Sequence, residues 1–158
     1  MKTLRAVLAV ALLALAANSS SHAQTTAHPV QNPNLDPEAL RYALPADIPW
    51  IKGADADRAT LLGNPDKPGL YIVLVRWHAH NNSRPHFHPN DRYVTVLSGT
   101  WWVGTGSVYQ PDKMVPMATG SYITHVARQI HYDGAKDADC VIEIVGYGPA
   151  TPTDAETK

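Results

Sequence analysis

The sequence predicts an all-β protein with a single domain, built from short strands as a small barrel or a sandwich. Short β-type runs alternate with turn residues along the chain, and thirteen prolines and ten glycines supply the turns. No apolar period of 3.6 residues persists beyond the first two dozen residues, which argues against long helices. A length of 158 residues suits one ordinary domain.

The expected strands are runs rich in aliphatic, aromatic and β-branched residues, which favour a pleated, half-buried surface. They cover residues 71–77, 93–97, 101–103, 121–126 and 141–145. Turn chemistry separates them, for example at residues 63–66, 80–83 and 133–134. We expect the barrel to span residues 46–148, after an extended arm at 24–45 with one helical turn near Asp36, and before a flexible tail at 149–158.

Residues 1–23 have the pattern of a secretory signal peptide. Lys2 and Arg5 give a positive start, residues 6–17 are Ala, Val and Leu throughout, and Ala23 ends a stretch of small residues. The apolar run is shorter than the roughly 20 residues that a spanning helix needs, so we expect no stable membrane anchor. The sequence therefore predicts a periplasmic or secreted protein that begins near Gln24.

The charge balance points away from nucleic acid as a partner. Lys and Arg number 13 against 14 Asp and Glu, so the formal net charge is -1 and there is no basic excess. A single cysteine, Cys140, excludes an intramolecular disulfide, and its apolar neighbours favour a small buried side chain over a reactive thiol. Eight histidines stand out, and histidine is the commonest metal ligand.

Two of these histidines, His86 and His88, are spaced to act together. In a strand, residues two apart point to the same face, so this pair would direct both imidazoles into one space. Two imidazoles placed this way can share a metal ion. A single His-x-His pair is weak support for a metal site, because surface strands carry such pairs of histidines by chance.

The surrounding pattern resembles the cupin family. The first cupin motif combines a His-x-His pair with a later glutamate and glycine, and His86, His88 and Gly99 match it. The second motif runs from a glycine to a histidine, and Gly120 and His131 match it in the correct order. The resemblance covers residues 46–148 and implies a double-stranded β-helix, the jelly-roll barrel of cupins, with His86, His88 and His131 as metal ligands.

The chain departs from the cupin pattern at positions that shape turns and at one position that carries chemistry. The turn positions occupied by other residues are His80, Val126, Arg128 and Ala135. The chemical departure is Arg92, which stands where the metal-binding glutamate belongs. Asp91 is adjacent, but a shift of one residue turns a side chain to the other face, so it could act as a ligand only through a bulge.

Arg92 leaves two interpretations open. An anionic substrate could lie between a metal and the guanidinium, with a carboxylate paired to Arg92 in a bidentate way. Alternatively, Arg92 pairs with Asp91, Asp133 or Glu143 and meets no ligand, in a cupin that has lost its metal. A guanidinium near a bare cation would repel it, which is the physical case for that alternative.

Arg92 and two further residues are candidates for a catalytic role. Arg92, Tyr93 and His125 are the catalytic candidates; His125 could be a fourth ligand or a proton carrier, or a structural histidine at a strand end.

The pair His78 and His80 is expected to lie at a solvated loop rather than to bind metal. Trp101 and Trp102 should face opposite sides of their strand, so that one lies inside as a core aromatic or as the wall of an apolar ligand pocket.

The resemblance implies a metal-dependent enzyme that acts on a small, anionic molecule. A three-histidine site without the glutamate is similar to that of the thiol dioxygenases, so we expect iron first, with zinc, copper, manganese or nickel as alternatives. A non-redox isomerase or lyase uses the same residues. A non-enzymatic protein that binds a small anion is the alternative from another class, and a homodimer is a further expectation from the resemblance.

Export gives the first testable prediction. N-terminal sequencing of protein recovered from the periplasm or medium should read from Gln24, because a signal peptidase would cut after Ala23. Mature protein that retains Met1 would contradict it.

Overall fold

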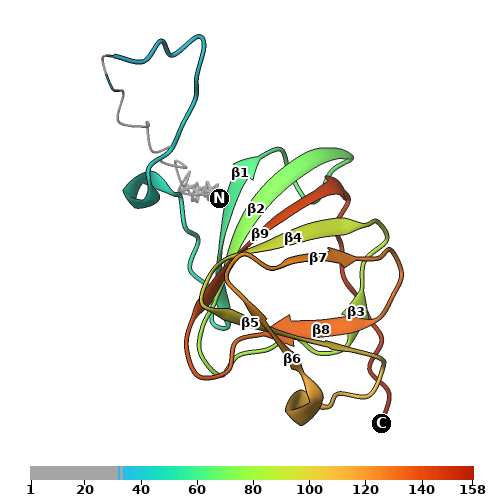
Figure 1. The fold of residues 1–158 in the computed structure, drawn as a ribbon. Helices are drawn as coiled ribbons and strands as arrows, with labels where there is room; N and C mark the ends of the chain where they lie inside the picture. Colours follow the sequence, from blue (N-terminus) through green and yellow to red (C-terminus); the bar gives the residue numbers. More distant parts are fainter. Residues whose placement is uncertain (1–31, 33) are drawn as a thin grey trace, which may run out of the picture.

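The computed structural model describes residue 32 and residues 34–158. Ten strands form two antiparallel sheets that face each other, as Figure 1 shows. The strands are β1 (Ala56–Leu62), β2 (Gly69–Trp77), β3 (His86–Phe87), β4 (Arg92–Ser98), β5 (Thr100–Thr105), β6 (Val115–Ala118), β7 (Tyr122–His125), β8 (His131–Gly134), β9 (Cys140–Gly148) and β10 (Thr153–Asp154). Two short 3-10 helices, η1 (Pro45–Asp47) and η2 (Pro111–Lys113), complete the elements.

Within each sheet, several strands that lie side by side are far apart in the sequence, as in a jelly roll. The larger sheet, which contains the longer strands, has the order β1-β2-β9-β4-β7, and the smaller sheet has the order β10-β3-β8-β5-β6. The predicted all-β fold with a single domain is confirmed, and all five predicted strand regions are strands. Within the described residues, no helix is long and apolar enough to cross a membrane. The predicted signal peptide lies outside the described residues.

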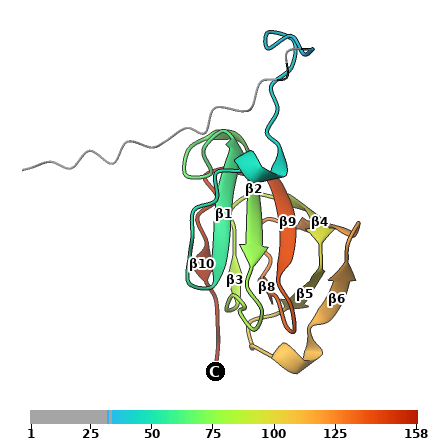
Figure 2. The same ribbon diagram turned by 90° about the vertical axis from the view of Figure 1, so that its left-hand side faces the viewer.

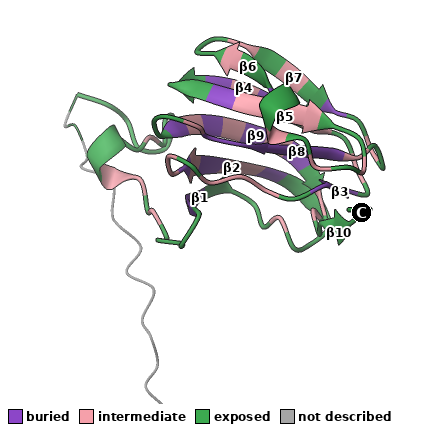
Figure 3. Ribbon diagram, turned by 90° about the horizontal axis from the view of Figure 1, so that it is seen from below, coloured by how far each residue is buried: buried purple, intermediate pink, exposed green. Residues whose placement is uncertain are grey.

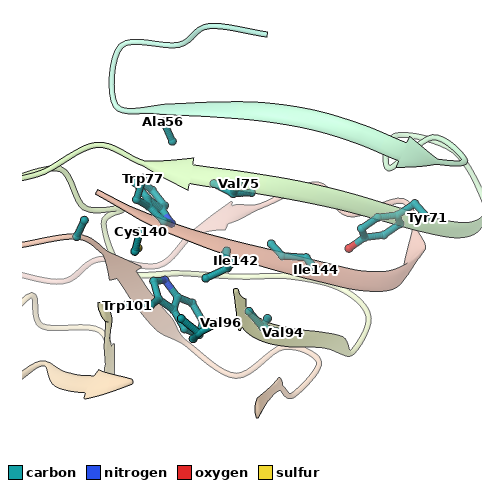
Figure 4. Close-up of a cluster of buried hydrophobic side chains, with 11 residues drawn as sticks. Ala56, Tyr71, Val75, Trp77, Val94, Val96, Trp101, Cys140, Ile142 and Ile144 are labelled. Carbon is teal, nitrogen blue, oxygen red and sulfur yellow. The ribbon is translucent and has the colours of Figure 1, made fainter. Parts of the chain in front are cut away.

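Alternation of side chains along β2, β4 and β9 builds the core between the sheets. The inward positions are apolar and buried, whereas their neighbours in sequence face outward. Figure 3 shows this burial on the strands, and Figure 4 shows the buried side chains that meet between them. They are Ala56, Tyr71, Val75, Trp77, Val94, Val96, Trp101, Ala135, Cys140, Ile142 and Ile144.

Glycines permit two close approaches in this core. Gly99 has a φ of 76° in the turn between β4 and β5, and a Cβ there would lie 2.6 Å from the carbonyl oxygen of Asp139. Gly134 was expected in a turn but ends β8, because it has no side chain to block the backbone of Asn81 and Asn82 beside it. The expectation of a turn at residues 133–134 is therefore wrong.

The C-terminal segment also differs from the expectation of a flexible tail. Thr153 and Asp154 pair with β3, and the backbone N–H of Ala155 donates to the carbonyl of Pro85 at 2.9 Å. Glu156 forms an ion pair with Arg84. The polar composition of this segment suggested that it would fray. The edge strand β3, however, has backbone N–H and C=O groups that the segment pairs with (Figure 2).

At the other end, the described part of the arm contains the single turn that the sequence predicts, with the N–H of Leu40 bonded to the carbonyl of Asp36 at 3.0 Å. The following segment lies beside β1, where Ile51 and Arg58 exchange two backbone hydrogen bonds. Trp50 lies under the guanidinium of Arg76, 4.1 Å from its ring centroid. These contacts close one edge of the larger sheet.

A buried carboxylate fixes this edge. Asp57 is 1% exposed and accepts hydrogen bonds from Lys52 Nζ at 2.7 Å and Arg76 Nη1 at 3.4 Å. His78 Nε2 lies 3.0 Å from the same carboxylate. The hydrogen bond from Lys52 is the main cause that lowers the pKa of Asp57 below its ordinary value of 3.8.

Replacement of Asp57 by Asn should lower the melting temperature at neutral pH, because the three partners would lose a charged acceptor. A lowered folded pKa means that the carboxylate stabilises above its unfolded pKa and stops doing so as the pH falls through the folded value. The difference between wild type and variant should therefore be full above about pH 5 and shrink below about pH 4. Thermal melting across pH checks this. Asp55→Asn, at an exposed neighbour, is the matched control.

Candidate metal centre

Three buried histidines converge between β3 and β8. His86 lies in β3 directly opposite His131 in β8, and His88 follows β3 by one residue. One ligand nitrogen from each of the three lies within 4.8 Å of the others. The predicted cluster of His86, His88 and His131 is therefore present in the structure, in a geometry that could hold a metal ion.

Backbone carbonyls orient all three imidazoles. His86 Nδ1 lies 2.7 Å from the carbonyl oxygen of Arg84, His88 Nδ1 lies 2.8 Å from that of Ala150, and His131 Nδ1 lies 3.0 Å from that of Gln129. A carbonyl only accepts, so each Nδ1 carries the proton and each Nε2 is left with a lone pair. An Nδ1 anchored in this way is the arrangement that metal-binding histidines adopt, with Nε2 left to face the metal.

The donor set fits a divalent metal. His88 Nε2 is buried and has no hydrogen-bond partner among the described residues, so its lone pair is left for a ligand. Burial lowers the pKa of His88 to about 3 and that of His131 to about 4, which keeps both rings neutral near pH 7. Neutral imidazoles suit zinc, copper, iron and nickel.

Arg92 begins β4 and points into the site, as the sequence predicts. Its Nη2 lies 2.8 Å from His125 Nδ1 and 3.4 Å from His131 Nε2, and its Nε is buried without a partner. Burial is the main cause that lowers its pKa. Within residues 34–158, Arg92 forms no ion pair, so the expected alternative of pairing with Asp91, Asp133 or Glu143 is not what the structure shows.

Asp91 lies outside the cluster. Its Oδ1 accepts the backbone N–H of Ala127 at 2.7 Å, and the residue is exposed. No bulge separates it from Arg92, which pairs in regular register with Gly146 and with His125. The alternative in which Asp91 rescues the missing carboxylate ligand is therefore wrong, because the period of the strand turns it outward.

His125 packs against the three-histidine cluster. It is 6% exposed, its ring centroid lies 3.8 Å from that of His131, and its Nδ1 accepts from Arg92. Burial holds its pKa far below the ordinary value for histidine. His125 is thus next to the three-histidine cluster but is not one of its members.

The structure does not bring Tyr93 to the site. Its side chain is 42% exposed, on the face of β4 opposite to Arg92, so the expectation of a catalytic role has no geometric support.

Of the two adjacent tryptophans of β5, Trp101 is the one that points inward, and its Nε1 donates to Asp133 at 3.0 Å. Trp102 is half-buried with Lys136 over its ring. Trp101 serves as a core aromatic and does not line the cavity at the cluster.

The other histidine pair is structural and solvated, as expected. His78 is held between Asp57 and the carbonyl of Ala54, whereas His80 is exposed with a φ of 66°. Neither joins the three-histidine cluster.

A cavity of about 560 Å³ opens beside the histidines. Its lining includes polar residues that sequence reasoning did not single out, namely Arg58, Tyr71 and Ser83, and also the C-terminal residues Ala150, Thr151, Pro152 and Asp154. Alternation along the predicted strand at residues 71–77 could have placed Tyr71 inside. Nothing in the sequence points to the carbonyl of Ala150 as the partner of His88, because any residue offers a carbonyl.

No family model and no curated protein sequence matches this chain. Solved structures do match. The polyketide cyclase RemF from Streptomyces resistomycificus superposes with a TM-score of 0.60 at 15% identity, over 75% of this chain and 87% of that one. A protein with a double-stranded β-helix domain from Klebsiella pneumoniae gives 0.54 at 19%, over 68% and 90%. A cupin-2 domain protein from Rhodospirillum rubrum gives 0.54 at 15%, over 80% and 81%.

The chain has the cupin fold. The predicted double-stranded β-helix is thus confirmed, and at these identities the similarity speaks for the fold alone. Several cupin-fold neighbours are enzymes by name, so the fold is compatible with catalysis.

Single replacement of His86, His88 or His131 by Ala should weaken metal affinity by about 100-fold or more, since even the outer partner of a ligand contributes about 10–100-fold. Elemental analysis after dialysis against a chelator measures the retained metal. His80→Asn is the matched control, because Asn tolerates the positive φ of that position. Equal metal content in all four variants would contradict the assignment of the site.

Proposed function

We propose that this protein is an exported, metal-dependent cupin enzyme that acts on a small molecule, an oxidoreductase of the dioxygenase type. The observation that carries the proposal is the set of three imidazoles, each anchored through Nδ1 to a carbonyl, of which His86 and His88 line the wall of a cavity. His86, His88 and His131 would hold the metal. Iron bound there supplies the ability to activate dioxygen.

The surrounding residues would order a substrate in the cavity. Val73, Val75 and Ile144 form an apolar wall that excludes water from one side of a bound molecule. Arg92, with its unpaired Nε, is a fixed positive charge beside the histidines and would orient an acceptor group of the substrate. His125 holds Arg92 in place through Nδ1.

A second candidate is favoured by one contact. Arg92 Nη2 faces His131 Nε2 at 3.4 Å, so the guanidinium already engages the lone pair that a metal would use. A cupin that binds a small anion without metal and without turnover is consistent with that contact. A non-redox enzyme is a further outcome to test, since neighbours of the same fold include a polyketide cyclase and proteins called DMSP lyases.

Metal analysis followed by turnover under controlled dioxygen distinguishes these functions. Protein recovered through its own export route should carry a stoichiometric metal, and with iron it should consume dioxygen when offered the right substrate from a panel of small carboxylic acids and thiols. Turnover that is equal without dioxygen would replace the oxidoreductase with a lyase or isomerase. Failure to retain iron, zinc, copper, manganese or nickel after loading would favour the metal-free binding protein. His88→Ala is the matched inactive variant, since it removes one of the three histidines of the cluster.

A further inference from the structure

Buried polar atoms without partners gather in one place. Five buried side-chain atoms lack a hydrogen bond among the described residues, and four of them belong to residues that line the same cavity. They are Tyr71 Oη, Trp77 Nε1, His88 Nε2 and Arg92 Nε. Buried polar groups are ordinarily hydrogen-bonded, so this concentration indicates a site shaped for a ligand that supplies the missing partners. Three of the four atoms are donors, which calls for a ligand rich in acceptors.

Tyr71 and Arg92 present two of these donors at one end of the cavity. Both residues pair with Gly146 on the intervening strand β9, Tyr71 from β2 and Arg92 from β4, so the three lie in one row across the sheet. A Cβ on Gly146 would lie 2.6 Å from Tyr71 Oη, so only glycine leaves room for the phenol to cross toward Arg92. Figure 4 shows Tyr71 at the end of the core opposite to Trp77.

Among the described residues, no carboxylate lies within ion-pair distance of the Arg92 guanidinium, although the charge of Asp133 acts on it from farther away. Arg84 is neutralised by Glu156, and the carboxylate of Asp133 accepts hydrogen bonds from the neutral side chains of Ser83 and Trp101. Asp66 and Asp154 also line the cavity but are exposed.

Arg58 and Arg92 remain without an ion pair in the described part of the chain. Arg58 lines the cavity while it stays exposed, which places it at the mouth. An anion that enters past Arg58 therefore meets two guanidinium groups and a phenol.

The walls next to these groups are apolar. Val73 and Val75 of β2 and Ile142 and Ile144 of β9 line the cavity between its ends. A fully inorganic anion would leave this surface in contact with water, whereas an apolar chain or ring would cover it. The cavity volume of about 560 Å³ is within the range of small-molecule sites.

We propose that Tyr71, Arg92 and Arg58 form a subsite for the carboxylate of a ligand whose apolar body lies along β2 and β9. This assignment rests on the proposed function in that the same cavity serves both, and it names the substrate class: a monocarboxylate with an apolar chain or ring. The subsite itself uses only side chains of this protein, so it can be tested in metal-free protein.

Calorimetric titration of the metal-free full chain with hexanoate and benzoate tests the proposal, with hexanamide and benzamide as neutral probes of the same shape. The carboxylates should bind roughly tenfold or more tightly than the amides, because hydrogen bonds to a charged acceptor are the stronger ones. Tyr71→Phe and Arg58→Gln should each lower hexanoate affinity by about three- to tenfold and leave the amides nearly unchanged. Arg92→Lys keeps the charge but loses the fork of donors, and it should weaken hexanoate as well.

Two matched controls accompany these variants. Tyr93→Phe removes a hydroxyl from the outer face of β4, and Arg41→Gln removes an exposed arginine from the segment before the barrel. Neither should change hexanoate affinity. Thermal melting confirms that each variant is folded, and Tyr71→Phe keeps the ring that fills the core.

The outcomes separate the subsite from the proposed function. Selective hexanoate binding that depends on Tyr71 and Arg58 supports the subsite, even if zinc titration shows that the histidines bind no metal. Zinc binding together with equal affinity for hexanoate and hexanamide would overturn the subsite and leave the metal site intact. Selective hexanoate binding that survives both Tyr71→Phe and Arg58→Gln would also overturn the assignment, because the anion would then be held elsewhere.

Discussion

The site depends on three backbone carbonyls that take the Nδ1 protons of three imidazoles. The carbonyls of Arg84 and Gln129 each lie two residues before the histidine that they orient, so the local chain sets those two rings. The carbonyl of Ala150 is 62 residues away from His88 in sequence; it lies just after β9, where the N–H of Ala150 donates to the carbonyl of Pro65 at 2.7 Å. The local chain and the segment after β9 therefore determine where the lone pairs point, and the larger sheet supplies the wall that they face.

Arg92 links the two halves of the cavity. Its Nη2 contacts His125 and His131, while its Nε has no hydrogen-bond partner among the described residues. A guanidinium cannot donate to His131 Nε2 and at the same time leave that lone pair to a cation. In the usual cupin pattern a carboxylate at this position would lower the charge beside the metal; here the position raises it. A negative group from outside the protein is the physical means by which both cations could be accommodated together.

Much of the fold and half of the site could be predicted from the sequence. Runs of aliphatic, aromatic and β-branched residues predicted the strands around Tyr71–Trp77 and Cys140–Gly148. The resemblance to cupins correctly turned Arg92 inward, and the period of a strand turned Asp91 outward. Strand β1 escaped prediction because its Asp, Arg and Thr residues look like loop until the segment around Trp50 covers one face. Strand β8 was read in part as a turn because Asp133–Gly134 is ordinary turn chemistry, and only the close approach of Asn82 explains that glycine. Tyr93 was chosen for its proximity in sequence to Arg92, whereas Tyr71 is the tyrosine that reaches the cavity.

The order in which the chain is made bears on the anchoring of His88. Ala150, whose carbonyl orients this ring, is synthesised after every strand of the larger sheet, as are β10 and Glu156, which tie that segment to β3 and Arg84. A nascent chain could thus form most of the larger sheet with only two of its three imidazoles oriented. All three imidazoles are oriented only after this segment has docked, so a metal that needs all three would be selected in the compartment where folding ends, among the ions available there.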